Sequence, residues 1–104
     1  MMSEISVQEL QALKESQADF FLLDVRDPEE YAVCNLQGHL IPSRELPERL
    51  NELNPQQQII VHCLSGGRSS RAVAFLLEQG FTNVSNLRGG IKAWAREIDP
   101  TMPL

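Results

Sequence analysis

The 104 residues are 42% hydrophobic and 22% charged, a composition typical of a domain with a packed core and not of a disordered chain. The net charge of −5 argues against nucleic-acid binding, and no apolar run approaches the roughly 20 residues that a membrane span needs. We expect one domain over residues 1–104, located in the cytoplasm, because its start lacks signal-peptide features and two cysteines make no disulfide framework.

The charge is unevenly distributed along the chain. Residues 62–96 hold five basic residues and one acid, a net of +4, whereas the rest holds four basic residues and thirteen acids, a net of −9. A positive segment in an acidic chain favours a small anion as ligand, since a long polyanion would be repelled by the acidic remainder.

The first half of the chain alternates helical and extended patterns. Ser6 and Glu9 form a capping box that predicts a helix ending at about Lys14. The apolar run over residues 20–25 predicts a strand buried on both faces. Further on, the pattern predicts a helical turn capped by Asp27, a very short strand over 40–42 and a helix over 43–53.

The second half repeats a strand, a loop and a helix. It predicts strands over 58–62 and 84–87, a loop over 63–68, a helix over 69–79, a turn over 88–90 and a last helix over 91–97. Apolar strands alternating with amphipathic helices predict an α/β fold, a parallel sheet with helices on both faces. Ligands of such sheets bind beyond the carboxyl ends of the strands, where the loop at Cys63 is expected to lie.

The loop that starts at Cys63 has the composition of an anion cradle around a thiol. Cys63 directly follows a buried strand, and Gly66 and Gly67 allow the backbone to curl so that N–H groups point inward. Arg68 closes the ring of the loop with a fixed positive charge as the helix begins. A thiol held there ionises more readily than a free cysteine. We therefore predict Cys63 as the catalytic residue, with the substrate-binding residues Leu64, Ser65, Gly66, Gly67, Arg68 and Ser69 around it.

The spacing within the loop separates two kinds of cysteine chemistry. Cysteine-dependent phosphatases place five residues between the cysteine and the arginine, whereas four stand between Cys63 and Arg68. The tighter ring suits one sulfur atom better than a tetrahedral phosphate, so the spacing favours sulfur transfer. A phosphatase or arsenate reductase and a non-catalytic sulfur-sensing or binding module remain the alternatives.

Three motifs in order make the chain resemble the rhodanese family along nearly its whole length. They are Leu23-Asp24-Val25-Arg26-Asp27-Pro28-Glu29-Glu30-Tyr31, the Cys-x-x-Gly-x-Arg loop at 63–68, and Leu87-Arg88-Gly89-Gly90-Ile91-Lys92-Ala93-Trp94. The resemblance implies an open parallel five-stranded sheet flanked by helices. It also implies that Cys63 accepts sulfane sulfur as a persulfide and passes it to cyanide or to a thiol, with no metal or organic cofactor.

Two departures from the commoner family pattern bear on the sulfur donor. The stretch 35–42 is more similar to rhodanese domains fused behind enzymes that activate sulfur-carrier proteins. Leu64 stands where many members have a basic residue, which weakens the case for thiosulfate. The expected partner is a small sulfur-containing anion or a sulfur donor or acceptor protein, such as the persulfide of a cysteine desulfurase.

The remaining polar residues are expected to be structural or peripheral. Neighbours on a strand point to opposite faces, so His62 is a structural histidine more than a base for Cys63. Asp24 and Arg26 are expected to brace the loop, and Cys34 to take no part. For four residues two interpretations stay open: Ser65 and Ser69 either donate to the sulfur or cap the helix, and Arg71 and Arg88 either rim the pocket or lie in solvent.

Overall fold

A computed structural model describes residues 3–104. Its strands are β1 (Ser3–Ile5), β2 (Phe21–Asp24), β3 (His39–Leu40), β4 (Ile59–His62) and β5 (Val84–Leu87). Its α-helices are α1 (Val7–Glu15), α2 (Pro28–Val33), α3 (Gly67–Glu78) and α4 (Gly90–Glu97), and two 3₁₀ helices, η1 (Ser43–Glu48) and η2 (Leu50–Glu52), follow β3.

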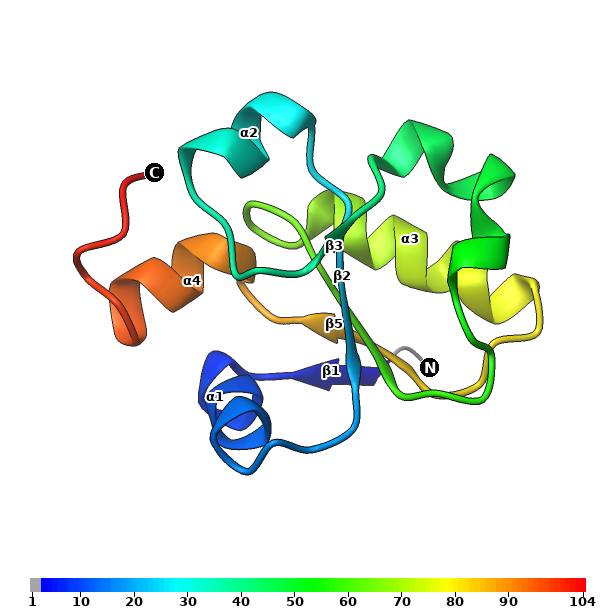
Figure 1. The fold of residues 1–104 in the computed structure, drawn as a ribbon, viewed down its shortest axis with the longest axis horizontal. Coiled ribbons are helices and arrows are strands. Elements are labelled where there is room, and N and C mark those ends of the chain that lie inside the picture. Colours follow the sequence, from blue (N-terminus) through cyan, green and yellow to red (C-terminus); the bar gives the residue numbers. More distant parts are fainter. Residues whose placement is uncertain (1–2) are drawn as a thin grey trace.

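The five strands form one sheet in the order β1-β5-β4-β2-β3, and every pair is parallel. The central strand β4 is buried along its whole length, which explains why its sequence is an apolar run and not an alternating pattern. Figure 1 shows the sheet with helices on both of its faces. The predicted α/β fold with an open parallel five-stranded sheet is therefore confirmed.

Each face of the sheet has its own hydrophobic cluster. Helix α3 and the two 3₁₀ helices cover one face, where Val73 and Leu76 pack with Leu46 and with Val61 of β4. Helices α1 and α4 cover the other face, where the buried side chains include Leu10, Ile60, Ile91 and Trp94. Consecutive residues of β4 thus face different helices. None of the helices described in residues 3–104 is long and apolar enough to cross a membrane.

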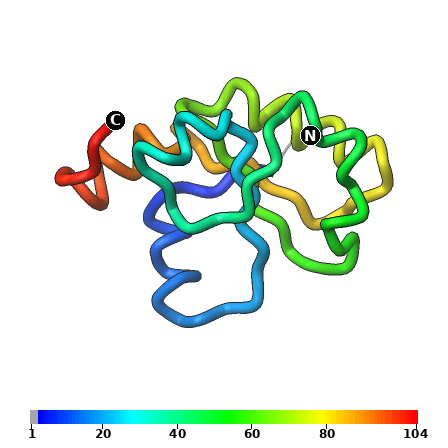
Figure 2. Tube along the Cα trace, turned by 45° about the horizontal axis from the view of Figure 1, so that its top comes forward, coloured from blue at the N-terminus to red at the C-terminus, as the bar shows by residue number. Residues whose placement is uncertain are grey.

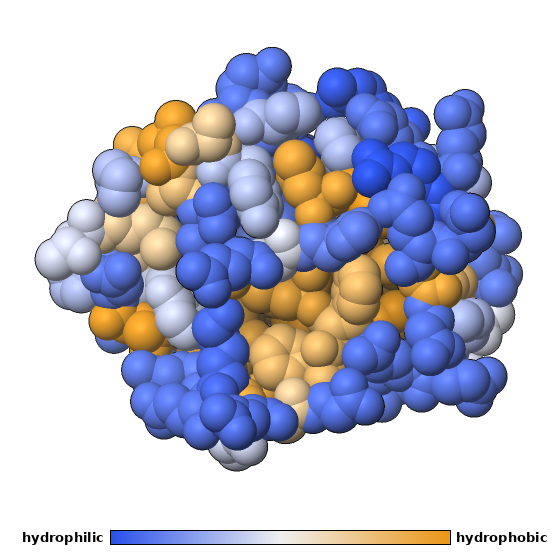
Figure 3. Space-filling model, in the orientation of Figure 1, coloured by the Kyte–Doolittle hydropathy of each residue, from blue (hydrophilic) through white to orange (hydrophobic). Residues whose placement is uncertain are grey.

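The carboxyl ends of β2, β4 and β5 meet on one side of the molecule. The loop after β4 lies there beside α2 and beside the first turn of α4, as Figures 1 and 2 both show. In the orientation of Figure 1, the space-filling view in Figure 3 shows apolar side chains gathered around β2 and β3, bordered by hydrophilic residues. A separate cavity beside the amino end of β2 is lined by the apolar Phe20, Phe21, Leu22 and Leu36 together with the polar Lys14, Gln37 and His39.

The structure differs from the prediction at four elements, three that were predicted otherwise and one that was missed. Strand β1 was not predicted, β3 is His39–Leu40 and not 40–42, and the helix expected over 43–53 is a pair of 3₁₀ helices. Pro47 lies inside η1, where its missing N–H prevents a regular α-helix. Helix α3 begins at Gly67 and not at Ser69, so the loop after β4 is shorter than expected and Arg68 lies in the helix.

Candidate functional site

Cys63 lies at the carboxyl end of the central strand with only 1% of its surface exposed. Its Sγ accepts hydrogen bonds from the N–H of Gly66 at 3.1 Å, the N–H of Ser69 at 3.4 Å and the Ser69 hydroxyl at 3.3 Å. Burial by itself opposes ionisation, but these donors and the Ser65 N–H outweigh it and hold the pKa of the Cys63 thiol below its ordinary value. The predicted cradle of N–H groups is therefore present around the sulfur.

The curl of the loop depends on one of its two glycines. Gly66 has a φ of 116°, in the region that side chains with a Cβ rarely adopt, and it precedes the first residue of α3. Gly67 has no positive φ, and a Cβ added there would meet nothing within 4 Å. The prediction that both glycines permit the curl is thus right for Gly66 and wrong for Gly67.

The first turn of α4 binds the backbone of the Cys63 loop through two hydrogen bonds. The N–H of Ile91 donates to the carbonyl of Cys63 at 2.9 Å, and the N–H of Lys92 donates to the carbonyl of Leu64 at 3.0 Å. A Cβ on Gly90 would lie 2.6 Å from the first carbonyl oxygen and 2.5 Å from the second. Gly90 is therefore needed because two backbones meet here, whereas a Cβ on Gly89 would lie 2.6 Å from Cβ of Ala93 in α4 itself.

Ser69 connects the sulfur to a buried asparagine that sequence reasoning missed. The Ser69 hydroxyl lies 3.3 Å from Cys63 Sγ, 3.3 Å from the Gly66 carbonyl and 2.5 Å from Oδ1 of Asn86, which belongs to β5. A hydroxyl has one proton for these three acceptors. Asn86 therefore competes with the sulfur for the Ser69 proton. Of the two roles considered for Ser69, the structure supports donation to the sulfur.

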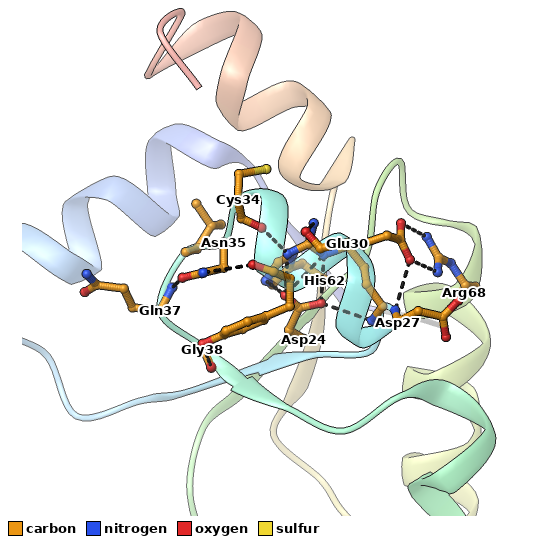
Figure 4. Close-up of polar contacts among 12 residues, drawn as sticks. Asp24, Asp27, Glu30, Cys34, Asn35, Gln37, Gly38, His62 and Arg68 are labelled. Atoms are coloured by element: carbon orange, nitrogen blue, oxygen red, sulfur yellow. Dashed lines mark hydrogen bonds and ion pairs between the residues drawn. The ribbon is translucent and has the colours of Figure 1, made fainter. Parts of the chain in front are cut away.

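Arg68 does not close the loop as predicted. Its guanidinium makes a bidentate ion pair with Glu30 of α2, at 2.7 and 2.9 Å, and Figure 4 shows the two side chains facing each other. The hydrogen bonds from Arg68 lower the pKa of Glu30 to about 2. A cation in the first turn of a helix is unfavourable unless an anion is near, and Glu30 is that anion. Most of the charge of Arg68 is therefore neutralised within the protein.

The outer residues of the loop have lesser roles in the structure. Leu64 and Ser65 are both exposed, and Leu64 takes part only through its carbonyl in the bond from α4. Within residues 3–104 no side-chain hydrogen bond of Ser65 caps the helix or reaches the sulfur. Of the predicted substrate-binding residues, Gly66 and Ser69 thus bring donors to the sulfur most directly.

A buried polar cluster fixes α2 beside the loop. Arg26 donates to the carboxylate of Asp24 at 2.8 Å and to the carbonyl of Cys34 at 2.9 Å, so it braces the C-terminal end of α2. His62 is fully buried, 3.5 Å from Asp24, and neither ring nitrogen has a hydrogen bond among the described residues. Burial lowers the pKa of His62, which favours the neutral ring. The structural interpretation fits His62, whereas the hydrogen bonds of Arg26 brace α2 and not the loop itself.

The other candidates lie apart from the sulfur. Cys34 packs with the cluster under α1 and α4, whereas Cys63 belongs to the cluster under α3. Arg71 lines a cavity together with Arg68, but Arg88 lines a different cavity beside α1. In residues 3–104 no three histidine, cysteine or acidic side chains are grouped as metal ligands would be.

Comparison with known proteins identifies the family. The model of the rhodanese-like domain matches residues 6–97. A sulfurtransferase of Allochromatium vinosum is 38% identical over 97 residues, which cover 92% of this chain and 91% of that protein. The putative sulfur carrier protein YrkF of Bacillus subtilis is 37% identical over 92% of this chain, which spans 52% of YrkF.

Solved structures agree with the sequence comparison. A rhodanese-like domain protein of Staphylococcus aureus is 31% identical with a TM-score of 0.83, over 89% of this chain and 91% of that one. A thiosulfate sulfurtransferase of Pseudomonas aeruginosa is 31% identical with a TM-score of 0.82, over 91% of this chain but 19% of that one. The fold, the family match and these relatives together show that the chain belongs to the rhodanese-like sulfurtransferase family.

Proposed function

We propose that this protein carries sulfane sulfur as a persulfide on Cys63, between a donor and a thiol or cyanide acceptor. The observation that carries the proposal is the set of three hydrogen bonds that converge on Cys63 Sγ from Gly66 and Ser69. Donors held in place by a strand and a helix stabilise a sulfur anion without reorganising during the reaction. The lowered pKa of the Cys63 thiol favours the thiolate that the chemistry needs.

The transfer has two displacement steps. The Cys63 thiolate attacks the outer sulfur of the donor, the S–S bond of the donor breaks, and sulfite or a thiolate leaves with the electron pair. An acceptor nucleophile then attacks the outer sulfur of the Cys63 persulfide, and Cys63 leaves as a thiolate. Cyanide as acceptor gives thiocyanate, and a thiolate gives a new persulfide. The N–H groups of Gly66 and Ser69 stabilise the negative sulfur in each state.

The charge at the loop supports a persulfide donor over thiosulfate. Thiosulfate carries two negative charges, and the arginine beside the loop is already paired with Glu30. Leu64, at the position where many family members have a basic residue, adds no charge. A persulfide with one charge needs less compensation, so a cysteine-bound persulfide of a donor protein is the better substrate.

Intact mass measurement tests the proposal directly. The protein is incubated with thiosulfate, and in parallel with a persulfide-loaded cysteine desulfurase, and its mass is recorded before and after cyanide is added. We expect the gain of one sulfur atom and its loss as thiocyanate. Cys63→Ser should abolish the gain with the circular dichroism unchanged, and Cys34→Ser, the matched control, should retain it.

Two results would contradict the proposal. Turnover retained by Cys63→Ser would show that another residue carries the sulfur. No gain from either donor would favour the binding-module alternative, and hydrolysis of an aryl phosphate that depends on Cys63 would favour the phosphatase. The bidentate pairing of Arg68 with Glu30 speaks against the phosphatase, because that arginine is then not free to bind phosphate.

A further inference from the structure

An apolar cavity of about 190 Å³ lies between α2 and the loop that holds Cys63. The residues that line it are Arg26, Glu30, Val33, Cys34, Leu64 and Leu104. It joins segments that are far apart in the chain, because the tail after α4 turns back towards α2 (Figure 1). Figure 3 shows apolar side chains gathered where α2 and this tail meet.

Exposed apolar side chains are concentrated around this cavity. Of the four large hydrophobic side chains that are exposed among residues 3–104, Val33 (60%), Leu64 (37%) and Leu104 (59%) line it. The fourth, Leu77, lies on α3 and does not line the cavity. Single exposed hydrophobic residues are common, but a contiguous group of them marks a surface that another molecule covers.

The cavity offers no free charge to a ligand. Arg26 is buried and pairs with Asp24 at 2.8 Å, and Glu30 pairs with Arg68 at 2.7 Å, so both charged residues of the lining are neutralised within the protein. The volume is also below the roughly 300–1,000 Å³ of small-molecule sites. An uncharged, apolar side chain of a partner protein therefore matches the cavity, whereas a small anion does not.

The position of Leu64 identifies the partner. Leu64 directly follows Cys63, so the two Cα atoms lie about 3.8 Å apart. A protein partner covers about 800 Å² of the surface that it binds, so a partner seated on Leu64 also covers the loop around the sulfur. A protein with another role would block the sulfur donor there. The occupant that is compatible with the reaction is therefore the donor itself.

We propose that Val33, Leu64 and Leu104 form the docking surface for the protein whose cysteine persulfide donates sulfur to Cys63, and that an apolar side chain near the donor cysteine occupies the cavity. The inference rests on the proposed function and names the surface that the donor uses. In the step concerned, the Cys63 thiolate attacks the outer sulfur of the donor persulfide, the S–S bond of the donor breaks, and the donor cysteine leaves as a thiolate. The three apolar residues act by binding the donor.

Cysteine peptides test this surface because the transfer is reversible. Transfer from the Cys63 persulfide to a cysteine thiol is the reverse of uptake from a cysteine persulfide, and it passes through the same transition state. Two pentapeptides with blocked ends carry a central cysteine between glycines, and their end residues are both leucine or both serine. Each peptide, and 2-mercaptoethanol as a small thiol, is mixed with persulfide-loaded protein. The second-order rate constant for loss of the extra sulfur is measured by intact mass.

We expect the wild type to transfer sulfur to the leucine peptide about tenfold faster than to the serine peptide, the equivalent of about 1.4 kcal/mol from burial of one apolar side chain. Val33→Ser and Leu104→Ser should each reduce this preference to about threefold, and the double variant should abolish it. Transfer to 2-mercaptoethanol should stay unchanged in all of them. Leu77→Ser is the matched control, because Leu77 is also an exposed leucine, and it should keep the full preference.

The outcomes separate this inference from the proposed function. Equal rates for the two peptides in the wild type, or a preference that both substitutions leave unchanged, would overturn the docking surface while sulfur transfer itself stands. A wild-type dimer in sedimentation velocity that Val33→Ser dissociates would also overturn it and assign the surface to a second copy of the chain. Failure of the wild type to take up sulfur or to pass it to any thiol would instead overturn the proposed function.

Discussion

The ionisation of Cys63 should depend on the competition for the single proton of Ser69. The hydroxyl is closer to Asn86 Oδ1, at 2.5 Å, than to the sulfur, at 3.3 Å. In Ser69→Ala the sulfur loses this donor but keeps the N–H groups of Gly66 and of residue 69. In Asn86→Leu the nearest competing acceptor is removed, so the hydroxyl divides its proton between the sulfur and the Gly66 carbonyl only, both at 3.3 Å. The two substitutions should therefore shift the Cys63 pKa in opposite directions.

The magnitude follows from the hydrogen bonds. A bond to a charged group contributes about 1.5–3 kcal/mol, and one pKa unit corresponds to about 1.4 kcal/mol. Complete loss of the Ser69 hydroxyl bond would raise the pKa by about 1–2 units. Because Asn86 already takes a large share of the proton, we expect a rise of about 1 unit in Ser69→Ala and a fall of about half a unit in Asn86→Leu.

The assay is the ultraviolet absorbance of the thiolate as a function of pH, in a Cys34→Ser background so that Cys63 is the only thiol. Circular dichroism verifies that each variant is folded. Asn86→Leu should have no effect on the pKa once Ser69→Ala is present, because the shared proton is then gone. An equal fall in both backgrounds, or an unchanged pKa in Ser69→Ala, would refute the competition.

Two further predictions concern stability. Glu30→Gln should lower the free energy of unfolding by about 1 kcal/mol at pH 7, the upper range for a partly exposed ion pair. The pKa of Glu30 is lowered from 4.5 to about 2, so its contribution is present above pH 4.5 and lost as the pH falls towards 2. Urea denaturation of the wild type and of Glu30→Gln at pH 7 and at pH 2 measures this contribution. A difference in the free energy of unfolding that persists at pH 2 would contradict it. Gly90→Ala should cost about 3 kcal/mol or more, from its positive φ and its contact with the carbonyl of Cys63. Gly80→Ala, the control with positive φ and nothing within 4 Å, should cost about 1 kcal/mol by thermal denaturation, and equal costs would refute the steric argument.

The strands and helices with strong local patterns were predictable. The apolar run that forms β4 and the stop at Gly80 after α3 are visible in consecutive residues. Strand β1 was missed because its residues Ser3–Ile5 are short, mostly exposed and paired only with β5 at the sheet edge. The prediction of one helix over 43–53 was wrong because it followed the spacing of the leucines and did not take account of Pro47, which interrupts an α-helix.

The candidate site was predictable to the extent that it is contiguous. Cys63, Gly66 and Ser69 lie within one short segment, so the sequence predicts that N–H groups surround the sulfur. Glu30 and Asn86 were missed, although both follow recognisable patterns. Glu30 is the third helical residue after the cap Asp27, and Asn86 is a polar residue in a strand that ends beside the loop. Neither pattern by itself says which side chain it will meet.

The sequence by itself determined the α/β fold class, the position of the thiol at the end of a buried strand and the glycine that lets the loop curl, because each depends on neighbouring residues. Only the tertiary structure decided that Glu30 neutralises Arg68, that Asn86 shares the proton of Ser69 and that α2 and the C-terminal tail line an apolar cavity beside the loop. These contacts join residues far apart in the chain, and their distances are set by how the helices pack on the sheet. The positive charge that a substrate meets is therefore set by how the helices pack on the sheet, whereas the nucleophile Cys63 can be identified from the sequence.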